Sequence, residues 1–167
     1  TTIATACFSG LDSFPLLAVP FFILAGNLMK FGGLSNKILE FADALVGHIK
    51  GSLGMVAVVA SMFFAALSGS SPATVSAIGS LTIPKMEEEG YDRAYATALN
   101  AAAGTIGVII PPSIPFVIYG VVANCSIADM FKAGILPGIL IGVVLMIVNY
   151  IAVTKNGYGL KNHAAKH

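Results

Sequence analysis

The sequence predicts an all-α, polytopic membrane protein, and three observations carry that prediction. Hydrophobic residues make up 56% of the 167 residues, and charged residues make up 10%, where a soluble domain carries about 25%. The charges cluster and leave four charge-free intervals, at 13–29, 51–84, 94–128 and 133–154. Because roughly 20 mostly apolar residues span a bilayer as a helix, these intervals are candidate membrane segments, the first of them a short one.

Composition also excludes several classes of function. A net charge of +1 with no basic stripe and no Trp excludes a nucleic-acid partner. Cys7 and Cys125 are isolated between apolar residues, which favours packed thiols over a disulfide or a metal pair. The three histidines, His48, His163 and His167, are too scattered for a transition-metal site. An opening at Thr1 without an initiator Met or a basic leader segment indicates a piece of a longer chain.

The first 50 residues predict one crossing helix and one surface helix. The crossing helix covers 13–29, with prolines that kink its first half. In 35–50, apolar residues such as Ile38, Phe41 and Leu45 recur at helical spacing with charged residues between them. This pattern favours an amphipathic helix in the membrane interface, and an ordinary helix between two spans is the alternative.

The interval 51–84 is too long for one span and is interrupted at its centre. Residues 67–74 read LSGSSPAT, a cluster of small, polar and helix-breaking residues. Broken backbone at membrane depth is tolerated only where protein buries it or where it lines a wet cavity, so the interruption suggests a site. The alternative is a seam of small residues that only packs helices.

The interval 94–128 has a second interruption. Asp92, in the charged segment 85–93, is placed to cap the helix that follows. Two glycines and three prolines then fall within 104–115, and an unbroken helix cannot pass through them. The sequence Ser126-Ile127-Ala128-Asp129 resembles a capping box before the final span, 133–154.

The basic residues favour one topology. If 51–84 returns as a hairpin and 94–128 crosses once, every Lys and Arg except Lys132 lies on one side, as the positive-inside rule expects. A single crossing of 51–84 divides the charges almost evenly. The hairpin topology predicts that 30–50, 85–93 and 155–167 are cytoplasmic. Charge counting leaves open whether the hairpin crosses twice, and its Ser/Gly/Pro tip favours a re-entrant form.

The four intervals can supply oxygen ligands and little else. They contain no Asp, Glu, Lys, Arg or His, which excludes a buried proton relay and leaves an enzyme without catalytic residues. Backbone carbonyls at the two breaks, with nearby Ser and Thr hydroxyls, are neutral ligands suited to Na⁺, and helix N-termini suit an anionic substrate. Paired interrupted segments therefore predict a secondary transporter.

Long motifs then resemble a known family. LSGSSPATVSAIGS at 67–80, EEEGYDRAYATALN at 87–100 and AAAGTIGVIIPPSIPFVIYG at 101–120 closely resemble the large membrane (M) subunit of the tripartite ATP-independent periplasmic (TRAP) transporters. GLDSFPLLAVPFFILAGNLM at 10–29 is similar to the second helix of that subunit. The resemblance covers nearly the whole chain, as an N-terminal-half fragment of the subunit.

The resemblance implies one half of an inverted repeat in an elevator-type transporter superfamily, with a re-entrant hairpin and a discontinuous transmembrane helix. The second repeat is absent, so the chain alone should not transport. The implied parts are a scaffold part at 1–50 (transmembrane helix 13–29, arm helix 35–50), a transport-domain part at 51–128 (hairpin 51–89, broken helix 94–124), a transmembrane helix at 129–154 and a polar tail at 155–167.

By similarity, the ion site is formed mainly by backbone carbonyls of Ser68, Gly107, Ile110 and Pro112. Candidate substrate contacts near the same breaks are Ser70, Ser71, Thr74, Thr105 and Ser113.

The implied function is Na⁺-coupled uptake of an organic acid across the bacterial inner membrane, with Na⁺ as the only cofactor. The substrate would be a C4-dicarboxylate or a sugar acid such as sialic acid. Besides the lipid bilayer, the implied partners are a small four-helix membrane (Q) subunit and a periplasmic substrate-binding (P) protein. Two alternatives stay open: a Na⁺/carboxylate symporter that works without a binding protein, and a non-transporting scaffold subunit.

Overall fold

The computed structural model describes residues 2–5, 12, 14–49 and 51–158, and in that part the chain consists of helices and the turns between them, without a strand. This confirms the all-α prediction. The elements that follow residue 12 are η1 (Phe14–Leu17), α2 (Ala18–Phe31), α3 (Leu34–Val46), α4 (Ser52–Ser68), α5 (Ser71–Thr74), η2 (Val75–Gly79), α6 (Ser80–Glu88), α7 (Arg93–Gly104), η3 (Thr105–Val108), α8 (Ile114–Val122) and α9 (Ile127–Asn156).

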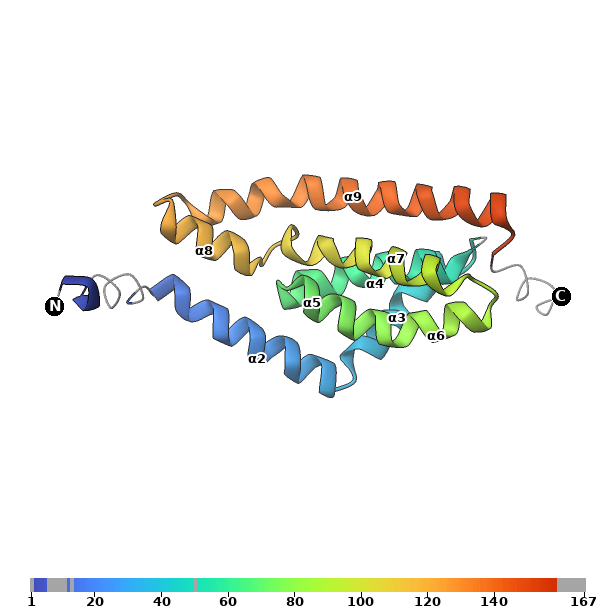
Figure 1. Ribbon diagram of the computed structural model, residues 1–167, viewed down its shortest axis with the longest axis horizontal. Helices are drawn as coiled ribbons and strands as arrows, with labels where there is room; N and C mark the ends of the chain where they lie inside the picture. Colours follow the sequence, from blue (N-terminus) through green and yellow to red (C-terminus); the bar gives the residue numbers. More distant parts are fainter. Residues whose placement is uncertain (1, 6–11, 13, 50, 159–167) are drawn as a thin grey trace.

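The helices form an elongated bundle with α9 along one side (Figure 1). Helices α7 and α8 follow one another beneath α9, and α4 with α5 and α6 lies alongside α7. Helix α2 lies on the side of the bundle opposite α9 and contacts α4 and α8. The hairpin and the broken helix therefore form the centre of the bundle.

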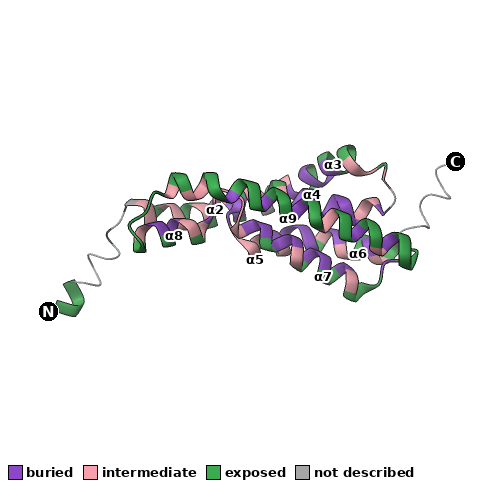
Figure 2. Cartoon of the chain, turned by 90° about the horizontal axis from the view of Figure 1, so that it is seen from above, coloured by how far each residue is buried: buried purple, intermediate pink, exposed green. Residues whose placement is uncertain are grey.

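Helix α9 is the one described helix that is long and apolar enough to cross a membrane by itself. It has 30 residues, and its most apolar window has a mean hydropathy of 2.4 with only 17% of that window buried. Figure 2 shows its exposed outer face, whereas Gly134, Gly138 and Gly142 are buried on its inner face. The helix begins before the expected residue 133 because the Ser126 hydroxyl caps it, accepting the Asp129 N–H at 3.3 Å.

Helices α2 and α3 form a bent pair. Together, Pro15–Met29 and Leu34–Val46 are long and apolar enough for one broken span, with a bend of 74° between them. Helix α3 stops at Val46 rather than near residue 50, because Gly47 ends it. Its inner face packs on α4, where Phe41 meets Phe63 edge to face with 5.2 Å between ring centroids.

Helix α4 and the run from α5 to α6 are two legs that turn back on each other at Gly69 and Ser70. The second leg contacts α4 along α5, η2 and α6. Val56, Ala60, Phe64 and Ile78 form part of the shared hydrophobic core. The helix is therefore interrupted within 67–74, at the predicted place.

The second interruption also lies where the glycines and prolines predict it. Asp92 caps α7 by accepting the Tyr95 N–H at 3.0 Å, and α7 ends at Gly104. A short 3-10 turn, η3, and the non-helical residues 109–113 follow before α8 starts. Ser113 caps α8 and accepts the Phe116 N–H at 3.4 Å.

A buried amide joins α9 to the start of the hairpin. The Asn149 side chain is fully buried, donates to the Gly51 carbonyl at 3.2 Å and accepts from the Tyr95 hydroxyl at 3.1 Å. The sequence reasoning did not single out Asn149. The only sign of its role in the sequence is that it is a polar residue within the apolar interval 133–154.

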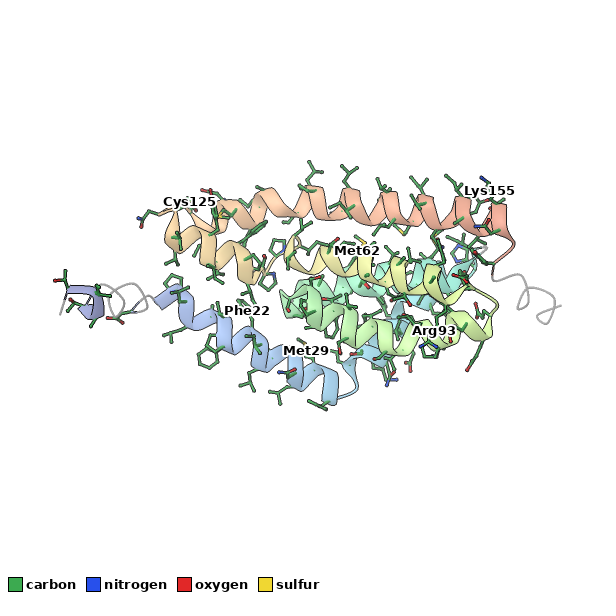
Figure 3. All side chains as sticks on the ribbon, viewed as in Figure 1. Phe22, Met29, Met62, Arg93, Cys125 and Lys155 are labelled. Carbon is green, nitrogen blue, oxygen red and sulfur yellow. The ribbon has the colours of Figure 1, made fainter. Side chains whose placement is uncertain are left out.

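Two basic residues and a cysteine mark the opposite ends of the bundle. Arg93 and Lys155 lie at one end and Cys125 at the other (Figure 3). Cys125 is a free, exposed thiol, so the prediction of a packed cysteine is wrong there. The turn that carries Cys125 sits at the end of the bundle, and its backbone packs on Gly120 while the thiol stays exposed. Cys7 lies outside the described residues.

Candidate ion and substrate site

The hairpin tip and the break in the second helix meet directly. The Ile114 N–H donates to the Gly69 carbonyl at 3.2 Å, which joins the tip to the first residue of α8. Gly69 has a φ of +61°, a conformation that favours glycine. A Cβ at Gly69 would lie 2.6 Å from the Pro112 carbonyl oxygen, so this approach also requires the absence of a side chain.

Two buried hydroxyls of the tip, those of Ser68 and Thr74, cluster around the backbone of Ser70. The Thr74 hydroxyl donates to the Ser70 carbonyl at 2.8 Å and lies 3.1 Å from the Ser68 hydroxyl. Ser68 Oγ also lies 3.4 Å from the backbone nitrogen and carbonyl oxygen of Ser70. Ser68 and Thr74 are 1% and 0% exposed. The cluster holds the tip in one shape without any charged group.

Gly107 in η3 packs directly on this cluster. A Cβ at Gly107 would lie 2.7 Å from Thr74 Oγ1 and 2.9 Å from the Ser70 carbonyl oxygen. One turn earlier, a Cβ at Gly104 would meet the Val75 side chain. The glycines of the broken helix thus let its backbone touch the hairpin tip.

The structure brings most of the expected site residues together. Ser68, Ser70, Thr74, Gly107 and Pro112 all lie at the contact between the tip and the break. Ser71 starts α5 beside them, and its carbonyl oxygen lies on the side of Gly104. These residues come from both interrupted segments, although up to 44 positions separate them in the chain.

Two of the expected hydroxyls, those of Thr105 and Ser113, donate to backbone carbonyls of their own segment, and the side chain of Ile110 faces α9. Thr105 is exposed, and its hydroxyl donates to the Ala102 carbonyl at 2.7 Å on its own helix. The Ile110 side chain packs against Gly138 of α9. Ser113 is fully buried, and besides capping α8 its hydroxyl donates to the Val108 carbonyl at 2.7 Å.

Sequence reasoning placed Gly69 in the predicted break but gave it no role in the site, and it did not connect Gly26 with this region. Gly69 stands inside the predicted tip, and its place between Ser68 and Ser70 at the end of an apolar helix was the available signal. Gly26 of α2 packs on Ser68 from the outside. No pattern in the sequence relates it to the tip.

The chemistry of the contact is that of neutral oxygens. Its ligand atoms are backbone carbonyls and hydroxyls, and no acidic or basic side chain belongs to the set. Within the described residues, no group of three or more His, Cys, Asp and Glu side chains could hold a metal ion. Such oxygens are weak ligands for transition metals and suitable ones for an alkali cation.

One cavity lies away from this contact. It has a volume of about 460 Å³, lies between α3, α4 and α6, and is lined by polar residues that include Glu40, Asp43 and Lys85. Because none of the tip residues lines it, we do not treat it as the substrate site.

Comparison with known proteins decides the family. The family model described as the DctM component of the tripartite ATP-independent periplasmic transporter matches residues 1–167. The chain belongs to this family. The resemblance inferred from the motifs is therefore confirmed. Because the related proteins are transporter permeases, the prediction that the chain is not an enzyme is confirmed too.

Curated relatives agree with this assignment. The chain is 51% identical over 93% of its length to the isethionate TRAP transporter permease protein DctMQ of Oleidesulfovibrio alaskensis, covering 25% of that protein. It is 47% identical over 90% of its length to the C4-dicarboxylate TRAP transporter large permease protein DctM of Pseudomonas aeruginosa, covering 35% of it. For the sialic acid TRAP transporter large permease protein SiaM of Vibrio cholerae, the identity is 48% over 89% of the chain and 35% of the relative. The chain thus spans between a quarter and about a third of these relatives.

One prediction needs correction. The segments 30–50, 85–93 and 155–167 were expected in the cytoplasm, but the chain belongs to a family of integral inner-membrane permeases. Helix α3, inside the first segment, packs along α4 within the bundle and is no free cytoplasmic loop. Lys50 and residues 159–167 lie outside the described residues. The inner-membrane part of the prediction fits the family.

Proposed function

We propose that the chain is part of the translocating subunit of a TRAP transporter that couples uptake of an organic acid to Na⁺. The observation that carries this proposal is the buried contact between the hairpin tip and the broken helix. Both segments contribute neutral oxygens there, from residues that the family resemblance assigns to an ion site.

Sodium is the cargo ion that suits this contact. Carbonyls of Ser68, Gly107, Ile110 and Pro112, at the tip and the break, would hold it. An ion held by both segments orders the tip against the break. Binding of Na⁺ would thus complete the surface that receives the substrate.

An organic acid is the substrate class that we propose. The named relatives transport isethionate, C4-dicarboxylates and sialic acid, all of which carry an acid group. The N-terminus of α8 and the hydroxyls of Ser70, Ser71, Thr74 and Ser113 would meet the carboxylate, and Thr105 would take part only after rotating. A C4-dicarboxylate is the specific candidate.

The hairpin would be re-entrant. Helix α4 has 17 residues, about 26 Å as a helix, less than the roughly 30 Å of a bilayer core. The site would then lie at membrane depth, and transport would follow when the loaded domain slides as an elevator against a scaffold that includes α2 and α3. Because Asn149 joins α9 to the start of the hairpin, we assign α9 to the moving part.

The full transporter would need its partners. A small four-helix membrane (Q) subunit would complete the scaffold, and a periplasmic substrate-binding (P) protein would deliver the acid. The name DctMQ of one relative is consistent with a membrane partner for the large permease.

Uptake into proteoliposomes tests the proposal. The full-length permease that contains this chain is reconstituted with its small partner, the binding protein is added outside, and uptake of labelled C4-dicarboxylate, sialic acid and isethionate is compared under inward Na⁺ and K⁺ gradients. We expect uptake of one acid that requires both Na⁺ and the binding protein.

Other outcomes would refute the proposal in distinct ways. Uptake driven by Na⁺ without the binding protein would indicate the unaided symporter. A folded complex that takes up none of the acids would indicate the scaffold subunit.

A further inference from the structure

Helix α2 touches the hairpin tip at a glycine. Gly26 is buried although most of α2 is exposed, and a Cβ at this position would lie 3.6 Å from Ser68 Cβ and 3.9 Å from Ser68 Cα. Helix α2 also contacts α8, the second half of the broken helix. It therefore covers the tip and the break together from outside the bundle.

The residue that Gly26 touches organises the tip. Ser68 is 1% exposed, and its hydroxyl contacts Thr74 Oγ1 and the backbone of Ser70. A push on Ser68 would therefore move the hydroxyl cluster, and Gly107 packs on the same cluster from the opposite segment. A shift of α2 toward Ser68 would thus change the shape of the candidate ion site.

We infer that Gly26 is a positioning residue for the sodium site, through which α2 seats Ser68 and the hydroxyl cluster of the tip. This inference rests on the proposed function, since it concerns the same site. Gly26 contacts neither ion nor substrate. Its lack of a side chain lets α2 lie against Ser68 in the arrangement described, which would be one end of the proposed sliding movement.

Two substitutions of different size separate positioning from general packing. In Gly26→Ala the new methyl lies 3.6 Å from Ser68 Cβ, an ordinary van der Waals contact, so half-saturating Na⁺ for uptake should stay within about twofold. Gly26→Leu extends the side chain beyond a Cβ that already contacts Ser68, and we expect half-saturating Na⁺ to rise about tenfold or more.

The matched control is Asn27→Leu, which adds bulk at the next position of α2, where the side chain is exposed. It should leave the Na⁺ dependence unchanged. The second readout is the thermal stability of each purified full-length permease with and without Na⁺. If Gly26 has a purely structural role, Gly26→Leu should lower the Tm by the same amount with and without Na⁺. If Gly26 positions the site, the rise in Tm on adding Na⁺ should be smaller in Gly26→Leu than in the wild type.

A cross-link tests the contact itself without relying on transport. Cβ atoms 3.6 Å apart suit a disulfide. In the full-length permease with its other cysteines replaced, Gly26→Cys with Ser68→Cys should oxidise with copper phenanthroline and then resist labelling by a maleimide polymer. The control pair Asn27→Cys with Ser68→Cys should still react with the maleimide polymer after the same oxidation. If Gly26→Cys with Ser68→Cys still reacts with the maleimide polymer after oxidation, the inference is overturned.

The two proposals fail in distinguishable ways. If the wild-type permease shows neither Na⁺-dependent uptake nor Na⁺-dependent stabilisation, the proposed function fails and the positioning inference fails with it, even where the cross-link forms. If the wild type uses Na⁺ and Gly26→Leu keeps the same half-saturating Na⁺, only the positioning inference is overturned.

Discussion

The substitution Gly107→Ala adds one methyl group at the contact between the two interrupted segments. Its Cβ would lie 2.7 Å from Thr74 Oγ1, 2.9 Å from the Ser70 carbonyl oxygen and 3.1 Å from the Ser70 carbonyl carbon. Optimal non-bonded separations are about 3.5 Å or more, so either the tip or η3 must move by several tenths of an ångström. Because both oxygens belong to the tip, this shift opens the proposed ion site.

The size of the effect follows from the cost of overpacking. Forcing an extra methylene into a well-packed interior costs about 1–3 kcal/mol. If that cost falls on the ion-bound arrangement, it weakens Na⁺ binding by roughly 5- to 150-fold, since 1.4 kcal/mol is a factor of ten. Gly107→Val should weaken it further.

The assay is the Na⁺ dependence of acid uptake by the full-length permease with its partners. Gly79→Ala is the matched control, because it adds the same methyl in the hairpin, away from the tip, at a position where the nearest atom is 3.4 Å away. We expect a raised half-saturating Na⁺ for Gly107→Ala and an unchanged one for Gly79→Ala. Both proteins should reach the membrane in normal amounts.

Two results would refute this reasoning. An unchanged Na⁺ dependence in a folded Gly107→Ala permease would mean that the contact has no role in ion binding. A loss of assembly with normal Na⁺ dependence in the surviving protein would mean that Gly107 only packs helices.

Three further predictions concern the frame around the site. Gly69→Ala should abolish uptake and lower the Tm, because Gly69 has a φ of +61° and its Cβ would overlap a carbonyl; a thermal melt with Tm within a degree of wild type would contradict this. Asn149→Ala should cost about 1–3 kcal/mol, seen as a lower Tm, since the Gly51 carbonyl and the Tyr95 hydroxyl lose their partner. Burial raises the pKa of Tyr91 to about 12, so its contribution to the free energy of unfolding is full below about pH 10 and is lost as the pH rises through 12. The Tm of Tyr91→Phe should therefore fall less than the wild-type Tm between pH 10 and 12. An equal fall in the wild type and the variant would argue against this.

The helix breaks could be predicted from the sequence because their causes are local. Proline removes a backbone donor, and glycine accepts a positive φ, wherever the rest of the chain lies. The same holds for the caps at Asp92 and Ser126, whose side chains bond backbone groups three residues later. The early end of α3 was missed because Ile49 continues the apolar spacing beyond Gly47, the residue that ends the helix.

The site could be predicted only in part, because a break changes which way the following residues face. Thr105 stands in the expected segment, yet it is exposed at the start of the 3-10 turn η3. Ile110 follows that turn, and its side chain packs against Gly138 of α9. Spacing along the chain does not reveal that rotation. Contacts such as Asn149 with Gly51, which lie 98 positions apart, depend on packing that a single sequence does not reveal.

The prediction that 30–50, 85–93 and 155–167 are cytoplasmic was wrong. The count of basic residues grouped Arg93 with Lys155, and both side chains lie at one end of the bundle (Figure 3). That grouping identifies an end of a membrane-embedded bundle and does not make its segments cytoplasmic. The difference matters because α3 carries charges and still packs on the hairpin.

The most direct test of the account is the flux of sodium itself. Proteoliposomes with the full-length permease and its small partner receive radioactive sodium at equal concentration on both sides, and then the acid and its binding protein outside. If an acid gradient drives sodium inward, and only with the binding protein present, ion and acid move together as proposed. If the acid enters while sodium stays at its starting level, Na⁺ coupling is wrong and the contact between tip and break needs another role.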